Sequence, residues 1–203
     1  MSVSVEDVKK LREQTGAGMM DCKKALIEAN GDFEKAIAIL RERGVAVAQK
    51  RESRTASEGI IGCYIHTGGQ IGVMVELNCE TTFVAKTDEF QQLAKDIAMH
   101  IAWSNPEYLR REDVPEEVVA KEREVHRQWA INQGKPEHVI DKIVDGRMNE
   151  FYSRVCLLEQ PFVRDEEQTI QDVINAAIAK LGEKIQVARF VRYRVGETQR
   201  ESE

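Results

Sequence analysis

A chain of 203 residues, 42% hydrophobic and 32% charged, has the composition of a globular protein and the length for one ordinary domain with a smaller one beside it. No run reaches the ~18 consecutive apolar residues of a membrane-spanning helix, and the early acids Glu6 and Asp7 argue against a secretory signal or a transit peptide. We therefore expect a cytoplasmic location. The net charge of −6 disfavours a broad basic surface for nucleic acid, so we expect a protein partner.

The first fifty residues predict a domain of three short helices. Ser4 and Asp7 have the spacing of a capping box at the start of the first helix. Asp32 is placed to cap the third helix, which we expect to end at Gly44. The residues that separate the helices are Gly16, Gly18, Asn30 and Gly31. Helices this short are marginal alone, so they are expected to pack on one another.

A polar stretch then separates two domains. From Val45 to Ser57 the chain has no apolar periodicity, and it contains two arginines, Arg51 and Arg54. We interpret residues 51–57 as a linker. The predicted domains are therefore a helical domain over residues 1–50 and a core domain over residues 58–203.

Three strands are predicted in the core domain. Residues 58–66 and 71–79 carry apolar side chains at every second position, and the two glycines between them favour a β-hairpin. A third strand is expected at residues 185–195. Because an isolated hairpin is marginal in water, this strand must return to the first two. We expect a three-stranded antiparallel sheet packed with helices, which is an α+β fold.

The remaining elements of the core domain are predicted helices. One amphipathic helix follows Thr87 as its cap and ends before Asn105, which precedes a proline. Residues 116–156 predict a helical hairpin with its turn at Gly134. A last helix is expected to end at Gly182.

Patterns that would carry catalysis fail on spacing or context. Gly16 and Gly18 open like a dinucleotide fingerprint, but no strand precedes them, and Gly134 and Lys135 lack the rest of a phosphate-binding loop. The acids of residues 116–124 alternate with basic residues, which is typical of a solvated helix face. The histidines and cysteines lack metal-ligand spacing, and the cysteines are expected to be buried. They are His66, His100, His126, His138, Cys22, Cys63, Cys79 and Cys156. We expect no catalytic residue, no metal and no cofactor.

Two segments go beyond what folding requires. The helix start in residues 15–26 has two adjacent methionines, of which only one can face the small core well, and methionine is common at adaptable interfaces. The residues alone leave open whether both merely fill gaps. Residues 78–86 place Phe83 on a connection between a strand and a helix, where a ring is either tucked under its own helix or displayed to a partner. The residues alone favour a tucked ring.

These two segments, with Gln160 to Val163, resemble the signatures of the elongation factor Ts family. Residues 15–26 read Thr-Gly-Ala-Gly-Met-Met-Asp-Cys-Lys-Lys-Ala-Leu, and residues 76–85 read Glu-Leu-Asn-Cys-Glu-Thr-Thr-Phe-Val-Ala. The resemblance extends over essentially the whole chain, and the length corresponds to the compact form of the family. Members bind GDP-bound elongation factor Tu and release its GDP.

The resemblance implies roles for both segments. The N-terminal domain would have a ubiquitin-associated-like fold and hold the nucleotide-binding domain of elongation factor Tu. The residues implied there are Gly16, Ala17, Gly18, Met19 and Met20. The core domain would insert a loop beside the nucleotide and dislocate the bound magnesium. The residues implied in this loop are Thr81, Thr82, Phe83 and Val84.

One departure from the family pattern bears on this loop. The family usually has aspartate where this chain has Thr82, so the leading role falls to Phe83. Compact members act as homodimers through the core domain, so the resemblance also implies a homodimer. It implies neither an enzyme nor direct contact with nucleic acid or membrane.

Two other functions fit parts of the sequence. The helical domain could be a peptide adaptor on an unrelated scaffold, but an adaptor has no need of residues 81–85. The arginines of the last predicted strand suggest RNA binding, and they are Arg189, Arg192 and Arg194. The net acidity and the lack of exposed aromatics between them count against it.

Overall fold

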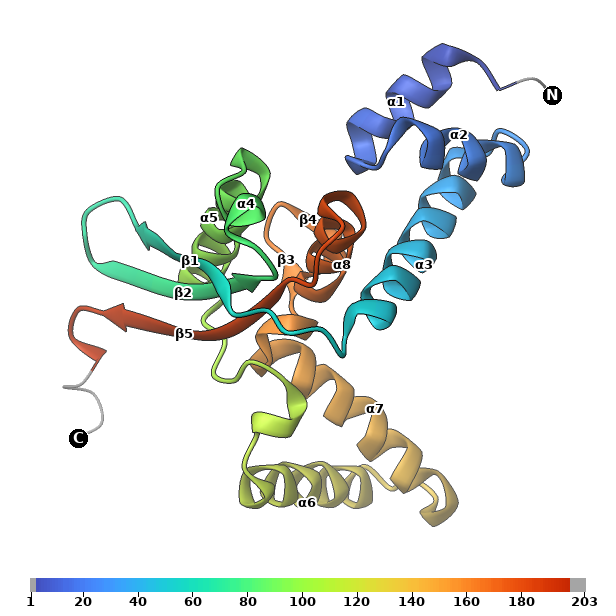
Figure 1. Ribbon diagram of the computed structural model, residues 1–203. Coiled ribbons are helices and arrows are strands. Elements are labelled where there is room, and N and C mark those ends of the chain that lie inside the picture. Colours follow the sequence, from blue (N-terminus) through green and yellow to red (C-terminus); the bar gives the residue numbers. More distant parts are fainter. Residues whose placement is uncertain (1–2, 198–203) are drawn as a thin grey trace. The chain divides into compact units, whose positions relative to one another are not determined.

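The computed structural model describes residues 3–197, and its helices and strands form an α+β protein (Figure 1). The predicted fold class is therefore confirmed. The chain divides into two compact units, one of residues 1–99 and 171–203 and the other of residues 100–170. The domain boundaries drawn from the sequence at residues 50 and 58 stay a prediction. Within the described range, no helix is long and apolar enough to cross a membrane.

Three helices open the first unit: α1 (Val5–Thr15), α2 (Met19–Glu28) and α3 (Phe33–Arg51). The predicted capping box is present, because the Ser4 side chain accepts from the Asp7 backbone and the Asp7 carboxylate accepts from Ser4. Asp32 caps α3 by accepting from the backbone N–H of Lys35. The buried residues that these helices share are Val8, Leu11, Cys22, Ala25, Leu26, Ala29 and Ala36.

The prediction that the third helix ends at Gly44 is wrong, because α3 continues through Gly44 to Arg51. The residue is buried, and a Cβ at this position would lie 3.6 Å from the backbone oxygen of Asn175 in α8 (Ile170–Leu181). A Cβ at this distance would be in ordinary van der Waals contact, so α3 and α8 lie side by side here without requiring a glycine. Glycine weakens a helix by only ~1 kcal/mol relative to alanine, so packing decides the outcome here.

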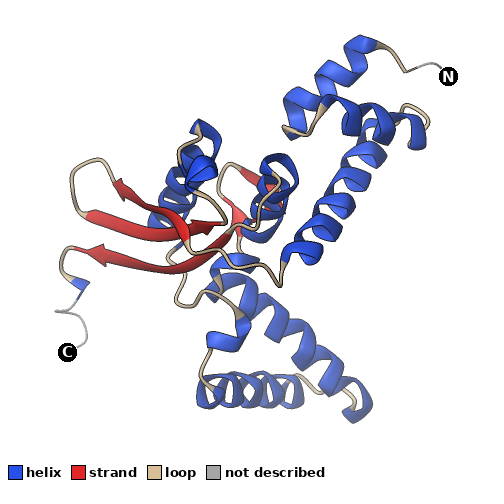
Figure 2. Ribbon diagram, in the orientation of Figure 1, coloured by secondary structure: helices blue, strands red, loops and turns tan. Residues whose placement is uncertain are grey.

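The sheet consists of β1 (Glu58–Ile65), β2 (Ile71–Cys79) and β5 (Gln186–Arg194), in the order β1-β2-β5 with antiparallel pairs (Figure 2). One face is buried through the central strand, whose inward side chains are Val73, Val75 and Leu77. On β1, Gly62 pairs with Val75, and a Cβ there would lie 3.0 Å from the backbone oxygen of Ala94. Glycine thus lets α5 (Asp88–Ser104) approach the sheet closely.

The other face of the sheet is apolar and exposed. We call it the open sheet face, and its residues are Ile61, Cys63, Ile65, Met74, Val191 and Tyr193. They share a face because Cys63 pairs with Met74 and Met74 with Val191. The prediction of four buried cysteines is therefore wrong for Cys63, although the other three are buried. Alternation shows that β1 has an apolar side, but it does not show which side the helices cover.

The second unit contains the predicted helical hairpin, formed by α6 (Glu116–Asn132) and α7 (Glu137–Val155). Its buried residues include Ala130, Val144 and Met148. Ion pairs join Arg123 to Asp145 and Arg127 to Asp141 across its surface. Sequence patterns missed the short elements around it, which are η1 (Arg111–Asp113), η2 (Leu157–Glu159), β3 (Pro161–Phe162) and β4 (Asp165–Thr169).

Candidate functional site

The second signature forms a tight turn directly after the central strand. The turn is the four-residue helix α4 (Thr82–Ala85), and Thr81 is its N-cap, with the hydroxyl oxygen accepting from the Val84 N–H at 3.4 Å. Thr87 closes the turn by donating its hydroxyl to the Val84 carbonyl at 2.8 Å, and it accepts from the Phe90 N–H at the start of α5. The predicted cap at Thr87 is therefore confirmed.

This turn presents the aromatic ring of Phe83 to solvent. The residue is 83% exposed, Thr82 is exposed, Val84 is half-buried, and Ala85 alone in the turn is buried. The interpretation of a tucked ring, which the residues alone favoured, is wrong. The anchoring is done by Ala85 and by hydrogen bonds, so Phe83 is free to contact another molecule.

A distant carboxylate, that of Glu183, binds the beginning of the turn. One oxygen, Oε2, accepts from the Glu80 N–H at 3.1 Å and from the Thr81 N–H at 3.0 Å. The other oxygen, Oε1, accepts from the Thr81 hydroxyl at 2.6 Å. Both backbone donors follow the end of β2 and have no strand partner, so Glu183 provides the acceptors that they need.

The side chain of Glu80 makes the reciprocal contact. Its Oε1 accepts from the Lys184 N–H at 2.6 Å and from Arg51 at 3.2 Å, while its Oε2 accepts from Arg54 at 3.0 Å. The Lys184 N–H, followed by the two arginines, holds the pKa of the Glu80 carboxyl below its usual value. Burial raises the pKa of the neighbouring Cys79 thiol, with the Glu183 charge adding to it, so the protonated thiol donates to the Thr81 carbonyl.

Sequence reasoning missed the residues that hold this turn. Glu183 lies 102 positions from its partner Thr81, and Arg51 and Arg54 belong to a stretch that the sequence predicts to be a polar linker. An isolated Glu-Lys pair after a helix end carries no signal of its own. Only the return of β5 to β2, which the sequence does predict, hints that Glu183 comes near the end of β2.

The first signature forms the corner between α1 and α2. Gly16 ends α1 in a left-handed conformation with φ of 66°, and Gly18 is the N-cap of α2. Met19 packs against the buried cluster together with Ala17, whereas Met20 is 62% exposed. The expectation that one methionine faces the core is confirmed, and Met20 is left as an apolar side chain on the surface.

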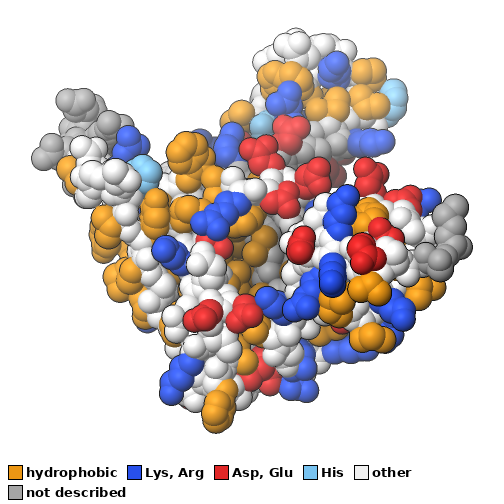
Figure 3. All heavy atoms as spheres, turned by 90° about the horizontal axis from the view of Figure 1, so that it is seen from above, with side chains coloured by type: hydrophobic (Ala, Val, Ile, Leu, Met, Phe, Trp, Pro, Cys, Tyr) orange, Lys and Arg blue, Asp and Glu red, His pale blue; other side chains and the backbone are white. Residues whose placement is uncertain are grey.

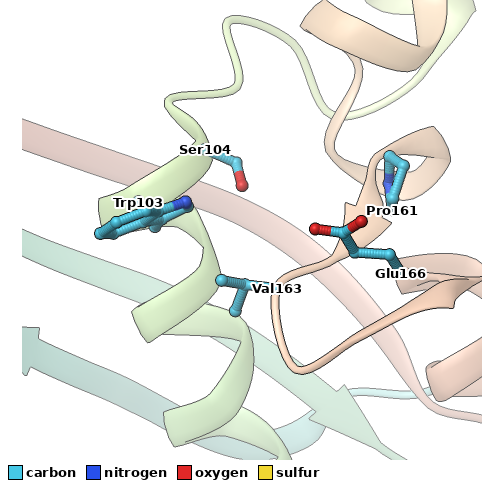
Figure 4. Close-up of a pocket in the computed structure, with 5 residues that line it drawn as sticks. All are labelled: Trp103, Ser104, Pro161, Val163 and Glu166. Atoms are coloured by element: carbon cyan, nitrogen blue, oxygen red, sulfur yellow. The ribbon is translucent and has the colours of Figure 1, made fainter.

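A shallow hollow of about 400 Å³ in the second unit gives no support for catalysis (Figure 4). It is lined by Trp103, Ser104, Pro161, Val163 and Glu166. The Ser104 hydroxyl lies 3.4 Å from Nδ1 of the buried His100, which resembles a nucleophile with its base.

The surroundings of His100 contradict that resemblance. Its Nδ1 accepts from the Val163 N–H at 3.3 Å, so Nε2 carries the proton and is 2.9 Å from the Gln160 side-chain oxygen. Burial lowers the pKa of His100, and no carboxylate of the described part of the chain is hydrogen-bonded to the ring, so the histidine is a neutral structural group. No group of acids, cysteines and histidines in residues 3–197 is arranged to hold a metal ion.

On the face drawn in Figure 3, the charged side chains do not form a field of one sign. Figure 3 shows acidic and basic residues interspersed over the visible face, with hydrophobic side chains between them. Two arginines of β5 fit this pattern, because Arg189 pairs with Glu76 and Arg192 pairs with Glu197. The expectation that no exposed aromatic lies between these arginines is wrong, because Tyr193 is 71% exposed. The pairing of Arg189 and Arg192 with carboxylates still makes them poorly suited to phosphate binding, which weakens the RNA-binding alternative.

Comparison with known proteins places the chain in a family. The model of the family described as Elongation factor TS matches residues 4–197. Elongation factor Ts of Moorella thermoacetica is 62% identical over 195 residues, covering 96% of either chain. The protein of that name from a Thermoanaerobacter species is 59% identical with the same coverage, and that of Carboxydothermus hydrogenoformans is 58% identical over 96% of this chain and 90% of its own. This chain therefore belongs to the elongation factor Ts family of translation elongation factors.

Proposed function

We propose that the protein binds elongation factor Tu in its GDP-bound state and promotes release of the GDP. The observation that carries the proposal is the exposed ring of Phe83 on an anchored turn, within a signature of the family. Inserted beside the nucleotide site, the ring displaces groups that hold the magnesium ion of elongation factor Tu. Weaker magnesium binding in turn weakens the grip on the phosphates.

The proposed role is that of a binding protein and not of an enzyme. An exchange factor needs no general acid or base, because it acts by linkage. If its binding weakens the binding of GDP by some factor, GDP weakens its binding by the same factor. The factor acts through its shape and through the preorganised position of its side chains. An anchored turn that presents one large side chain to solvent agrees with this role. The protein acts where translation occurs, in the cytoplasm.

The first signature provides a second contact in this proposal. Gly16, Ala17 and Gly18 form the corner, and Met20 projects beside it from the first turn of α2. A flexible apolar side chain at a corner fits a groove on a protein partner. The N-terminal helices would then supply affinity, while the turn that carries Phe83 would supply the disturbance of the nucleotide site. Thr82 brings no charge where relatives usually have aspartate, so the ring carries this role.

We further propose that the open sheet face binds a second copy of the chain. Sheets pack face to face through apolar side chains, and a twofold interface uses the same patch on both copies. The face has an apolar centre at Met74 and an ion pair between Glu76 and Arg189 beside it.

Light scattering in reductant should report twice the chain mass of 23.1 kDa. Met74→Lys should yield monomers, whereas Val125→Lys, at an exposed position of α6, should not.

The release of fluorescent GDP from elongation factor Tu tests the central proposal. Substoichiometric amounts of this protein should accelerate release, while the protein alone should hydrolyse no nucleotide. The acceleration should shrink when EDTA has already removed the magnesium. Equal release rates with and without the protein would refute exchange activity, and an acceleration that EDTA leaves unchanged would remove magnesium from the mechanism.

A further inference from the structure

Two glutamates link the turn that carries Phe83 to a segment about a hundred residues away. Glu183 accepts three hydrogen bonds from Glu80 and Thr81, and Glu80 accepts one from the backbone of Lys184. Hydrogen bonds to ionised acceptors are about twice as strong as neutral ones. Several strong hydrogen bonds therefore meet at the N-terminal end of the four-residue helix α4.

The bond to the Thr81 hydroxyl fixes how α4 begins. Because the hydroxyl donates its proton to Glu183 at 2.6 Å, its oxygen is left to accept from the Val84 N–H. That bond is the N-cap of the helix that carries Phe83. A single helical turn has almost no stability alone, so its geometry depends on such contacts.

The position of Glu183 is itself determined by the backbone. Gly182 ends α8 in a left-handed conformation with φ of 73°, which side-chain-bearing residues rarely adopt. The chain then enters β5, whose Gln186 pairs with Asn78 near the end of β2. Glu183 is thus held between a helix and a strand, and it can act as a fixed support for the turn.

These bonds contribute little that the core requires, because Phe83 faces solvent and only Ala85 of the turn is buried. Their effect is to hold the exposed ring in one orientation. A side chain that inserts into a partner needs a fixed orientation, whereas an ordinary surface loop does not. We propose that Glu183 is the positioning residue of the turn that carries Phe83. It sets the rate of GDP release without touching elongation factor Tu. This inference rests on the proposed exchange function.

The test uses the full chain with Glu183→Ala, and Glu150→Ala at an exposed position of α7 is the matched control. Hydrogen exchange with mass spectrometry should show that peptides covering residues 80–87 lose protection while those covering residues 71–79 keep it. The maximal rate of GDP release at saturating protein should fall by roughly ten- to a hundredfold. The concentration that gives half of this rate should change little, because the first signature still binds. The control should match the unchanged protein in all three measurements.

A merely structural role would lower the melting temperature and the fraction of active protein without changing the rate per folded molecule. Unchanged protection of residues 80–87, or lost protection with an unchanged maximal rate, would overturn the proposal. If the alanine variant does not fold, Glu183→Gln keeps the shape and is measured in the same way. If the unchanged protein fails to accelerate GDP release, the exchange function is wrong, and the hydrogen-exchange result still decides whether Glu183 orders the turn.

Discussion

The two signature segments present apolar side chains to solvent, but they are held in place by different forces. Residues 15–26 are anchored by the packing of Met19, Cys22 and Leu26 inside a three-helix cluster whose members are close in sequence. Residues 81–85 are anchored by Ala85 and by the carboxylate of Glu183. The first anchor depends on apolar contact within a local bundle, and the second on charged hydrogen bonds from a distant part of the chain.

Because the two anchors differ, mutations that affect folding stability and mutations that affect exchange activity should fall in different segments. In residues 15–26, the same short helix contributes to the core and to the surface, so a change in one disturbs the other. In residues 81–85, the exposed ring adds nothing to the core, and its support can be changed separately. We expect mutations of the buried residues in the first segment to act mainly through folding, and mutations in the second segment mainly through exchange.

The largest effect is expected for Leu26→Ala, because Leu26 is fully buried among the N-terminal helices. Truncation of a buried leucine costs about 2 to 5 kcal/mol of unfolding free energy. Urea unfolding should show this loss, whereas Leu26→Met, which keeps the volume, should lose less than about 1.5 kcal/mol. Equal stability of the alanine variant and the unchanged protein would show that the first anchor is not apolar packing.

Phe83→Ala should have the next largest effect, and it should appear in exchange only. An aromatic anchor in a partner contributes about 2 kcal/mol or more, which corresponds to roughly thirtyfold, and we expect this loss in the maximal rate of GDP release. Folding stability should change by less than about 0.5 kcal/mol, as at most surface positions. GDP release and thermal melting measure the two effects, and Trp103→Ala, with a ring that is 75% exposed, is the control. Early melting with normal exchange per folded molecule would reverse the assignment.

Met20→Ala should have a smaller effect than Phe83→Ala, and on affinity instead of the maximal rate. Met20 is exposed and flexible, so its truncation should raise the half-saturating concentration in GDP release by up to about tenfold, or about 1.4 kcal/mol. Ile131→Ala, at an exposed position of α6, should leave the half-saturating concentration unchanged. A lower maximal rate at full occupancy would mean that both segments disturb the nucleotide site.

The smallest effect concerns pH and the charged anchor. The Lys184 N–H and the arginines lower the pKa of Glu80 in the folded chain below its ordinary value of 4.5, so the unfolded chain binds a proton more readily. The stabilisation is fully present above that ordinary value and is lost as pH falls through the lowered pKa. An NMR titration should therefore show the Lys184 amide signal moving with a midpoint below 4.5. A midpoint at or above 4.5 would contradict the anchor.

Local signals in the sequence were sufficient to predict where most helices and strands lie. The capping box at Ser4, the cap at Thr87 and the glycine at 182 mark element ends that the structure confirms. Each works through neighbours within about four residues, so the sequence contains the whole interaction. The strand pairing was also predictable, because a hairpin needs a third strand and one apolar run remained.

Features that depend on distant neighbours could not be predicted in this way. Gly44, past which α3 continues, is buried beside the backbone of Asn175, and the order of residues 81–85 depends on Glu183. The exposure of Phe83 followed from the resemblance and not from the residues, since an aromatic near a helix start fits either orientation. The side of β1 that α5 covers depends on Gly62, whose missing side chain makes the approach possible.

The single exposed cysteine provides a natural site for chemical labelling. Cys22, Cys79 and Cys156 are buried, so a mild thiol reagent added to the folded protein should react at Cys63 first. Cys63 lies near the middle of the open sheet face, paired across the strands with Met74. The proposed dimer would cover this face, so the labelling rate of Cys63 should fall as the protein concentration rises, and a dye attached there needs no engineered site. The unmodified chain can thus be titrated from dilute to concentrated solution, with one chemical group recording the change.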